Sequence, residues 1–342
     1  MADCNHLQTL IEAAKLLTYD IVVVQEVPPQ LLPALKNPLL RKLIKILELT
    51  ISHAKAGNQI REHRYRDAII VHGFSTEFLV FTFIFSRFQA KNVYFLTHHN
   101  VQQAFQSSFI GLLFQMYHSL GYRFILNETT SILKELGYSE NQISQDVKLL
   151  HPIVKMNPPN LLNDDTRKKI GLVGKIRKGK QFDKTFNLLL EIQKSLDFVL
   201  VIGTDDFSYF NEIDTTEIKL VDTSTRDNYF AALALCDIIV LNYEKSKYFY
   251  RCSGVAADAI SVGTCVVCPD FPLMRNQINY PTKVGVLYDS ELELEQAIRK
   301  AMEMVSNPID ASFKEHYMER SIEKVAASFA EVIQSQIELR KS

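Results

Sequence analysis

The sequence predicts an α/β protein built from two successive open sheets of parallel strands, followed by one long C-terminal helix. Short apolar runs alternate with helical patterns along most of the chain, which is typical of parallel sheets covered by helices. The length of 342 residues suits two domains of ordinary size. The segment 151–167 is rich in proline. We interpret it as the link between the two series, because proline disfavours helices and central strands.

The first series is expected within residues 1–155 and opens on an amphipathic helix. Its strands are predicted at Asp20–Val24, Asp67–Val71, Asn92–Thr97, Arg123–Asn127 and Val147–Leu150, and its helices at Leu39–Ala56, Phe105–Leu120 and Ser131–Leu136. Each predicted strand is a short apolar run bounded by polar residues, and each helix shows apolar residues at a spacing of three to four.

The second series is expected within residues 156–310. Its strands are predicted at Lys169–Val173, Phe198–Ile202, Ile218–Val221, Ile238–Leu241, Cys265–Val267 and Gly285–Leu287, and its helices at Phe182–Ser195, Arg226–Leu235, Val255–Val262 and Leu292–Val305. Residues 311–342 form a third part. One continuous helical pattern, Ser312–Leu339, fills most of it, and we expect this helix to pack back toward the first domain.

Composition indicates a soluble globular protein, with 47% apolar and 23% charged residues and a net charge of −1. This balance gives no reason to expect a nucleic-acid partner. The most apolar run, Phe78–Phe85, is far shorter than the roughly 20 residues that span a bilayer. No leader precedes the first helix, so a cytoplasmic location is expected. Cys265 and Cys268 face opposite sides of a predicted strand, so we expect two core residues and no metal site.

A basic loop follows the first strand of the second series. Gly174 ends that strand, and four cations precede the next helix: Lys175, Arg177, Lys178 and Lys180. Cations beside the free N–H groups of a helix N-terminus favour an anion, although an ordinary solvated basic loop is an equally good explanation. The loop lacks the G-x-x-x-x-G-K-[ST] pattern of a P-loop.

A second anion site is expected at the start of the predicted helix Val255–Val262. Ser253 suits an N-cap position, and Gly254 lets the backbone approach a ligand closely. The helix dipole and the free N–H groups would both favour a phosphate there. One turn into the helix, Asp258 can accept hydrogen bonds from ribose hydroxyls. Tyr248 and the residues after it either contact substrate or pack against the wall of the site.

Together these segments resemble the C-terminal domain of GT-B fold glycosyltransferases of the glycosyl transferases group 1 family. The resemblance spans Lys169 to Ala301, with both motif regions in the family's order. It implies two Rossmann-like domains facing a cleft, with Arg177 and Lys180 acting on the diphosphate of the donor. The implied donor-binding residues are Gly174, Ser253, Gly254, Val255, Asp258, Tyr250 and Arg251.

The sequence departs from this family at three places. Many members carry two glutamates spaced E-x7-E; Asp258 takes the second position here, but the first falls on Tyr250, which cannot replace a carboxylate. Gln181 stands where the family usually has glycine. The chain also begins with a helix where the family begins with a strand and a glycine-rich loop, so either the first strand of that pattern is lost or the start is unusual.

The first series supplies candidate acceptor-side residues. His72 and His98 follow predicted strands, where a histidine can orient or deprotonate a hydroxyl, although single histidines often only end strands. The resemblance favours His98 over His72 and His99. Asn127 and Glu128 follow the next strand. The helical stripe from Pro38 to Lys55 is interpreted as a cover for the sheet, and a second interpretation places it on an anionic membrane surface.

The resemblance implies a glycosyltransferase that moves a sugar from a nucleoside-diphosphate sugar to a hydroxyl of a glycan or lipid-linked acceptor, in polysaccharide or glycolipid synthesis. It also implies a retaining reaction. The sequence contains no D-x-D, so we expect no metal and no cofactor beyond the nucleotide sugar, and contact with the inner face of the membrane is compatible with this function. Two alternatives stay open: a non-catalytic GT-B protein that binds a partner or glycan, and a nucleotide-sugar epimerase.

Overall fold

The computed structural model describes residues 2–341 except 18, 26–37, 73–91, 160–164, 177–179, 211–216 and 307–309. The apolar run Phe78–Phe85 and the cations Arg177 and Lys178 lie outside the described residues. The chain divides into two compact units, which we describe separately. The six-stranded unit comprises residues 1–5 and 150–324, and the five-stranded unit comprises residues 6–149 and 325–342.

The six-stranded unit contains a fully parallel sheet in the order β11-β10-β9-β6-β7-β8. Strand order reverses between the neighbours β6 and β9, so this sheet is doubly wound, and ligands in such sheets bind beyond the carboxyl ends of the strands at that reversal. The strands are β6 Lys168–Val173, β7 Phe198–Thr204, β8 Ile218–Asp222, β9 Ile238–Val240, β10 Cys265–Pro269 and β11 Gly285–Tyr288. All six match predicted strands, with ends shifted by at most two residues.

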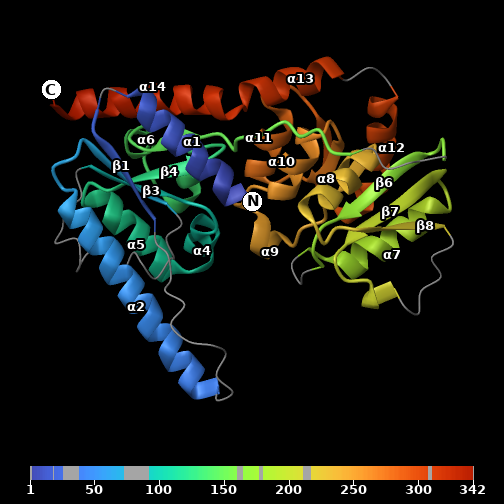
Figure 1. Ribbon diagram of the computed structural model, residues 1–342, viewed down its shortest axis with the longest axis horizontal. Coiled ribbons are helices and arrows are strands. Elements are labelled where there is room, and N and C mark those ends of the chain that lie inside the picture. The colour runs from blue at the N-terminus through green and yellow to red at the C-terminus, as the bar shows by residue number, and fades with distance from the viewer. Residues whose placement is uncertain are drawn as a thin grey trace. The chain divides into compact units, whose positions relative to one another are not determined.

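Helices pack against this sheet (Figure 1), with α7 against β7, α8 against β6 and β8, and α12 against β10 and β11. The helices are α7 Phe182–Gln193, α8 Arg226–Leu235, α9 Lys245–Tyr248, α10 Gly254–Ser261, α11 Pro272–Asn279, α12 Leu294–Val305 and α13 Asp310–Glu319, with 3-10 turns at Ser208–Phe210 and Glu291–Glu293. The sequence did not indicate α9 and α11, because each has only one or two turns of periodic pattern.

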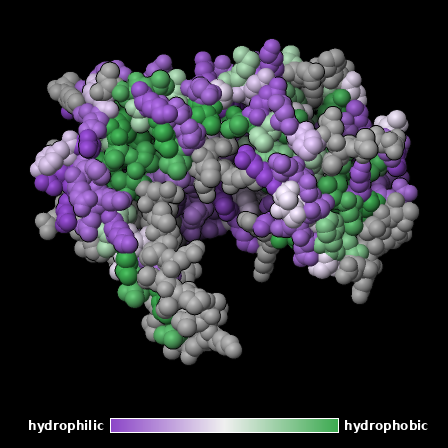
Figure 2. Space-filling model, in the orientation of Figure 1, coloured by the Kyte–Doolittle hydropathy of each residue, from purple (hydrophilic) through white to green (hydrophobic). Residues whose placement is uncertain are grey.

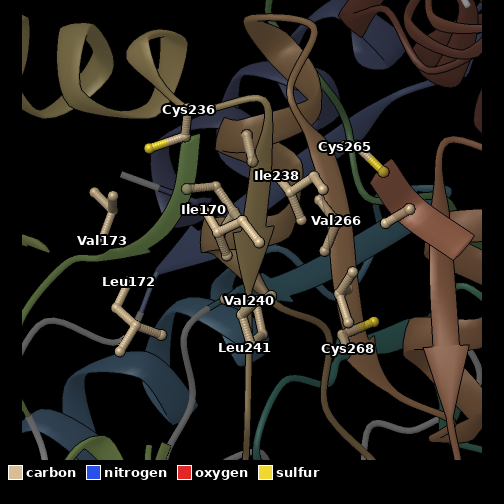
Figure 3. Close-up of a cluster of buried hydrophobic side chains, with 14 of the residues drawn as sticks. Ile170, Leu172, Val173, Cys236, Ile238, Val240, Leu241, Cys265, Val266 and Cys268 are labelled. Atoms are coloured by element: carbon tan, nitrogen blue, oxygen red, sulfur yellow. The ribbon is translucent and has the colours of Figure 1, made fainter. Parts of the chain in front are cut away.

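The core of the six-stranded unit lies along its central strands. Side chains from β6, β9 and β10 meet there, and Ile170, Ile238 and Val266 are fully buried (Figure 3). Cys265 and Cys268 are both buried and form no disulfide. Their sulfur atoms lie at separate levels of β10 (Figure 3). These strands are apolar throughout because helices bury both faces of a parallel sheet.

The predicted C-terminal helix Ser312–Leu339 is instead two helices, α13 and α14 Ile322–Lys341. The break is held by Arg320, which is fully buried. Its guanidinium donates to the carbonyl oxygens of Tyr280 at 2.9 Å and Asn276 at 3.0 Å, at the C-terminal end of α11. Ser321 then caps α14 by accepting a hydrogen bond from the N–H of Lys324. The local sequence contains neither glycine nor proline, so only these contacts reveal the break.

The five-stranded unit contains a parallel sheet in the order β1-β2-β3-β4-β5. Its strands are β1 Ile21–Gln25, β2 Ala68–His72, β3 Val93–Leu96, β4 Arg123–Asn127 and β5 Val147–Leu149. All five predicted strands are present. From Val325 onward α14 belongs to this unit, where the guanidinium of Arg340 lies over the Tyr94 ring of β3, 4.9 Å from its centroid.

The helices of this part of the chain are α1 Ala2–Leu16, α2 Pro38–Glu62, α4 Asn100–Gln106, α5 Ser108–Ser119 and α6 Glu140–Ile143. The prediction of one helix over Phe105–Leu120 is wrong. Ser107 is extended, with φ −133° and ψ 115°, and its side chain accepts a hydrogen bond from the N–H of Ile110. Serine competes for backbone hydrogen bonds in this way, which ends α4 and starts α5. Ser131–Leu136, also predicted as a helix, is a 3-10 helix.

Helix α2 is longer than predicted, and the burial of its apolar side chains differs between its two halves. Its second half is an ordinary cover helix, with Ala56 and Ile60 buried. In its first half, apolar side chains reach the surface (Figure 2), where Leu40, Ile46 and Leu47 are 45%, 53% and 54% exposed. Burial in the second half fits the interpretation as a cover for the sheet, and the membrane interpretation of the first half stays a prediction. No helix in the described part of the chain has the length and apolar character that crossing a bilayer requires.

One packing constraint in the core of the six-stranded unit is testable. A Cβ atom on Gly171 of β6 would lie within 2.4 Å of Cys236 Sγ and 2.8 Å of Ile239 Cδ1. We expect Gly171→Ala to destabilise this unit by about 1–3 kcal/mol through overpacking, measured by urea unfolding. Adding Cys236→Ala should recover part of the loss, with the single Cys236→Ala variant as control. Equal loss with and without Cys236→Ala would contradict this account.

Candidate functional site

A pocket of about 520 Å³ lies where several strands of the six-stranded unit end. Its walls come from the segments that follow β6, β7, β8 and β9, together with the first turns of α8 and α10. This is the edge at which a doubly wound sheet binds ligands. The lining residues are Gly174, Lys175, Lys180, Asp205, Thr223, Ser224, Thr225, Arg226, Tyr229, Tyr243, Tyr248, Arg251, Cys252, Ser253, Gly254, Val255 and Asp258.

The end of β6 brings a lysine to the start of α10. Gly174 has φ +112°, a conformation that favours glycine. A Cβ atom placed on it would lie 3.3 Å from Lys180 Nζ and 4.0 Å from Val255 Cγ2. The ammonium group and the first turn of α10 therefore approach the same point, and Gly174 leaves them room. Residues of both predicted loops therefore line the same pocket.

Two other residues of the β6 loop have different roles from Lys180. Lys175 forms an ion pair with Asp205 at 3.3 Å, so its charge is partly compensated. Gln181 precedes α7 with φ +47° and ψ 42°, in the left-handed region. The family's usual residue at this position is glycine, which adopts that conformation without strain, and Gln181 adopts the same conformation.

The N-terminus of α10 is fixed by buried polar contacts. Ser253 is the N-cap, and its Oγ accepts a hydrogen bond from the N–H of Ala256 at 3.1 Å. Gln277, fully buried on α11, holds the backbone of Ser253 from both sides. The N–H of Ser253 donates to Gln277 Oε1 at 3.0 Å, and Gln277 Nε2 donates to the carbonyl of Ser253 at 2.9 Å. Gln277 was not identified from the sequence, because its helix was not predicted.

An aromatic stack forms the wall beside this helix start. Tyr243 and Ser253 share a hydrogen bond of 2.9 Å between their hydroxyl oxygens. The rings of Tyr243 and Tyr248 stack with centroids 4.3 Å apart, and the guanidinium of Arg251 lies over Tyr248, 4.8 Å from its centroid. Tyr250, predicted to bind donor, is 8% exposed, packs its ring edge against Phe249, and does not line the pocket.

Asp258 lies one turn into α10 and faces the pocket. Its Oδ2 accepts a hydrogen bond of 3.0 Å from the hydroxyl of Tyr229 on α8. Burial raises the pKa of Asp258 to about 6, against an opposing effect of the Tyr229 hydrogen bond. Burial likewise raises the pKa of Tyr229 well above its ordinary value. The pair joins the first turns of two helices, a contact that sequence spacing could not show.

The acceptor-side candidates lie in the five-stranded unit, at the carboxyl ends of its strands. His72 is the last residue of β2 and His98 follows β3, and their rings meet edge to face with centroids 5.7 Å apart. The N–H of His98 donates to Asn100 Oδ1 at 3.2 Å, and His99 is exposed. Asn127 Nδ2 donates to the carbonyl of Thr97 at 2.9 Å. The structure thus pairs the two histidines that the sequence suggested separately.

No family model matches the sequence, and no curated protein matches it either. Solved structures match over most of the chain. A glycosyltransferase from Rickettsia africae is 12% identical with a TM-score of 0.59, and the match covers 99% of this chain and 95% of that one. HepE from Anabaena, in complex with UDP-glucose, is 11% identical with a TM-score of 0.51, covering 99% and 95%.

A chain of the GtfA/B complex is 11% identical with a TM-score of 0.56; the match covers 83% of this chain and 61% of that longer one. Structures of this kind have the GT-B architecture of two Rossmann-like domains. The chain has the GT-B fold. The predicted fold class is confirmed, with two parallel α/β units and a long helix, α14, at the end. The pocket belongs to the six-stranded unit, which contains the second of the two sheets along the chain.

The raised pKa of Asp258 makes a prediction about stability. Its folded-state pKa of about 6 exceeds the ordinary value of 3.8, so the folded state binds more protons between these values, and this contribution to stability is lost as pH rises from about 4 to 6. We expect Asp258→Asn to remove that loss. We would measure the melting temperatures of both proteins from pH 4.5 to 7.5. The melting temperature of the variant minus that of the parent should increase up to about pH 6 and stay constant above it. A constant difference across this range would contradict the assignment.

Proposed function

We propose that the chain is a glycosyltransferase that moves a sugar from a nucleoside-diphosphate sugar to a hydroxyl group of an acceptor. One observation carries this proposal: the ammonium of Lys180 and the first turn of α10 approach the same point beside Gly174, within a pocket at the strand reversal of a doubly wound sheet. A cation and a helix N-terminus aimed at one point form a site for phosphate.

The chemistry of glycosyl transfer explains this arrangement. As the bond between the sugar and the diphosphate breaks, negative charge gathers on the leaving diphosphate while the sugar acquires oxocarbenium character. Donors that are already in place stabilise that charge without further reorganisation. Lys180 and the N–H groups at Gly254 and Val255 would have this role, and the resemblance adds Arg177. Gln277 and Tyr243 keep the helix start in position through Ser253.

Nucleotide recognition would follow α10 from its N-terminus inward. Asp258 lies one turn beyond the proposed phosphate position, so its carboxylate is placed to accept hydrogen bonds from ribose hydroxyls. Tyr229 would orient that carboxylate through its 3.0 Å hydrogen bond. The UDP-glucose complex of HepE, which has the same fold, supports UDP as the first nucleotide to test.

The acceptor side belongs to the five-stranded unit in this proposal. His98, beside His72 at the carboxyl ends of β2 and β3, would orient or deprotonate the acceptor hydroxyl. We propose a metal-independent, retaining transfer to a glycan or lipid-linked acceptor in polysaccharide or glycolipid synthesis, carried out in the cytoplasm. The resemblance supports retention, and the absence of D-x-D from the sequence supports metal independence.

Calorimetric titration with UDP, GDP and ADP tests the donor site. We expect one of the three nucleotides to bind. Lys180→Ala should lower the affinity for it by at least tenfold, or about 1.4 kcal/mol, because the ammonium is proposed to face the phosphate. Arg177→Ala should have a similar effect. Lys184→Ala is the matched control, since Lys184 also lies near the start of α7 but pairs with Glu291 and does not line the pocket. If none of the three nucleotides binds the parent protein, the transferase proposal fails, and a partner-binding GT-B protein becomes the better explanation.

Helix α2 supports a further part of the proposal, contact with the inner face of a membrane. Its first half exposes Leu40, Ile46 and Leu47, and its sequence interleaves lysine and arginine with these residues, a combination suited to an anionic lipid surface. Such contact would bring a lipid-linked acceptor to the enzyme.

Sedimentation with phosphatidylglycerol vesicles tests this contact. The parent protein should sediment with the vesicles, and the double variant Ile46→Glu with Leu47→Glu should bind at least fivefold less, because it places two charges on the apolar surface. Leu292→Glu, at a residue 96% exposed in the six-stranded unit, is the control and should bind as the parent does. Equal sedimentation of all three proteins would remove α2 from the proposal.

A further inference from the structure

Arg251 offers the pocket a guanidinium whose charge no carboxylate compensates. It lines the pocket, and no described residue forms an ion pair with it. The other cations of this site are placed differently: Lys175 is paired with Asp205, and Lys180 lies beside the α10 N-terminus. Arginine differs from lysine in presenting a planar fork of donors that matches a carboxylate or phosphate group bidentately.

Aromatic contacts link this guanidinium to the start of α10. Tyr243 contacts the N-cap Ser253 directly, and Tyr248 stacks on Tyr243. Because Tyr243 covers one face of the Tyr248 ring, the guanidinium lies over the other face. Along the chain, Asp258 lies on the other side of this N-cap, one turn into α10. The lining thus includes Arg251 before the helix N-terminus and Asp258 after it.

If Asp258 marks the ribose side of the diphosphate, Arg251 lies on the side of the transferred sugar. Hydroxyl groups of a neutral sugar are commonly bound by carboxylates, yet both carboxylates that line the pocket are engaged elsewhere. Asp205 pairs with Lys175, and Asp258, held by Tyr229, is the carboxylate proposed to bind the ribose. The residue at the family's first glutamate position, Tyr250, is outside the lining. At the Arg251 end, the pocket thus offers the charged N–H groups of a guanidinium, which suit a ligand that accepts hydrogen bonds.

We propose that the transferred sugar carries a carboxylate, as in a uronic acid, and that Arg251 binds it. The inference rests on the proposed transferase function and names its class of donor. The carboxylate would accept two parallel hydrogen bonds from the guanidinium, which the Tyr248 ring supports through a cation–π contact. Arg251 is then the residue that selects an acidic sugar over a neutral one.

Calorimetry with UDP, UDP-glucose and UDP-glucuronate tests this selection, with GDP-mannose and GDP-mannuronate in their place if GDP is the nucleotide that binds. The parent protein should bind the acidic sugar nucleotide at least tenfold more tightly than the neutral one, or about 1.4 kcal/mol. Arg251→Gln should abolish that preference and leave the affinity for UDP within about threefold. Arg251→Lys should keep only part of the preference, because it retains the charge and loses the fork.

Two controls make the result specific. Arg226→Gln removes the same charge from the first turn of α8, on the ribose side of the pocket, and should leave the ratio between acidic and neutral sugars unchanged. Retained UDP affinity in Arg251→Gln shows that the pocket is intact. Tyr248→Leu keeps the guanidinium but removes its support, and should lower the preference without abolishing it.

Three results would overturn the inference. If the parent protein binds neutral and acidic sugars equally, no carboxylate is recognised. If Arg251→Gln lowers the affinities for UDP, UDP-glucose and UDP-glucuronate by one common factor, Arg251 binds the diphosphate. If the preference exists but survives Arg251→Gln, another residue selects the sugar. Failure of every nucleotide to bind the parent protein is a separate outcome, which would refute the proposed function itself.

Discussion

The fixed position of Ser253 is the constraint on which the candidate site depends. A helix N-terminus attracts anions only where its N–H groups are aimed and held. Here a fully buried amide, Gln277, binds the backbone N–H and carbonyl of Ser253 together, while Tyr243 binds its hydroxyl. These contacts come from α11 and from the segment after β9, so the sheet and its cover helices fix the start of α10 before any ligand arrives.

Two features of the site follow from that fixed helix start. Gly174 has φ +112°, a conformation that favours glycine, and the space beside it is approached by Lys180. Tyr243, which is hydrogen-bonded to Ser253, also stacks on Tyr248, and the guanidinium of Arg251 lies over the Tyr248 ring. The pocket lining therefore combines a lysine close to the start of α10 with a guanidinium that is linked to the same helix start through two tyrosine rings.

The carboxylates of the pocket show how context changes the role of a residue type. Asp205 compensates a neighbouring lysine at the pocket's edge. Asp258 is buried beside Tyr229, and its pKa of about 6 lies close to physiological pH. Burial disfavours the charged form, whereas a hydrogen-bond donor favours it. Ribose hydroxyls would add further donors, so nucleotide binding and ionisation of this carboxylate would support one another in the proposed enzyme.

The sequence by itself determined both parallel sheets, every strand in them to within two residues, and the two loops that carry Lys180 and Ser253. Hydrophobic periodicity and glycine placement are local signals, so they can be recognised in the sequence without knowledge of tertiary contacts. Only the tertiary structure decided the breaks at Ser107 and Arg320, the clamp of Gln277, the Tyr229–Asp258 pair and the removal of Tyr250 from the pocket lining. The contacts of Arg320, Gln277 and the Tyr229–Asp258 pair join groups far apart in the chain, and such meetings leave no periodic trace in the sequence. Ser107 and Tyr250 contact near neighbours, but the conformation of each is decided by local hydrogen bonding and packing that periodicity does not show.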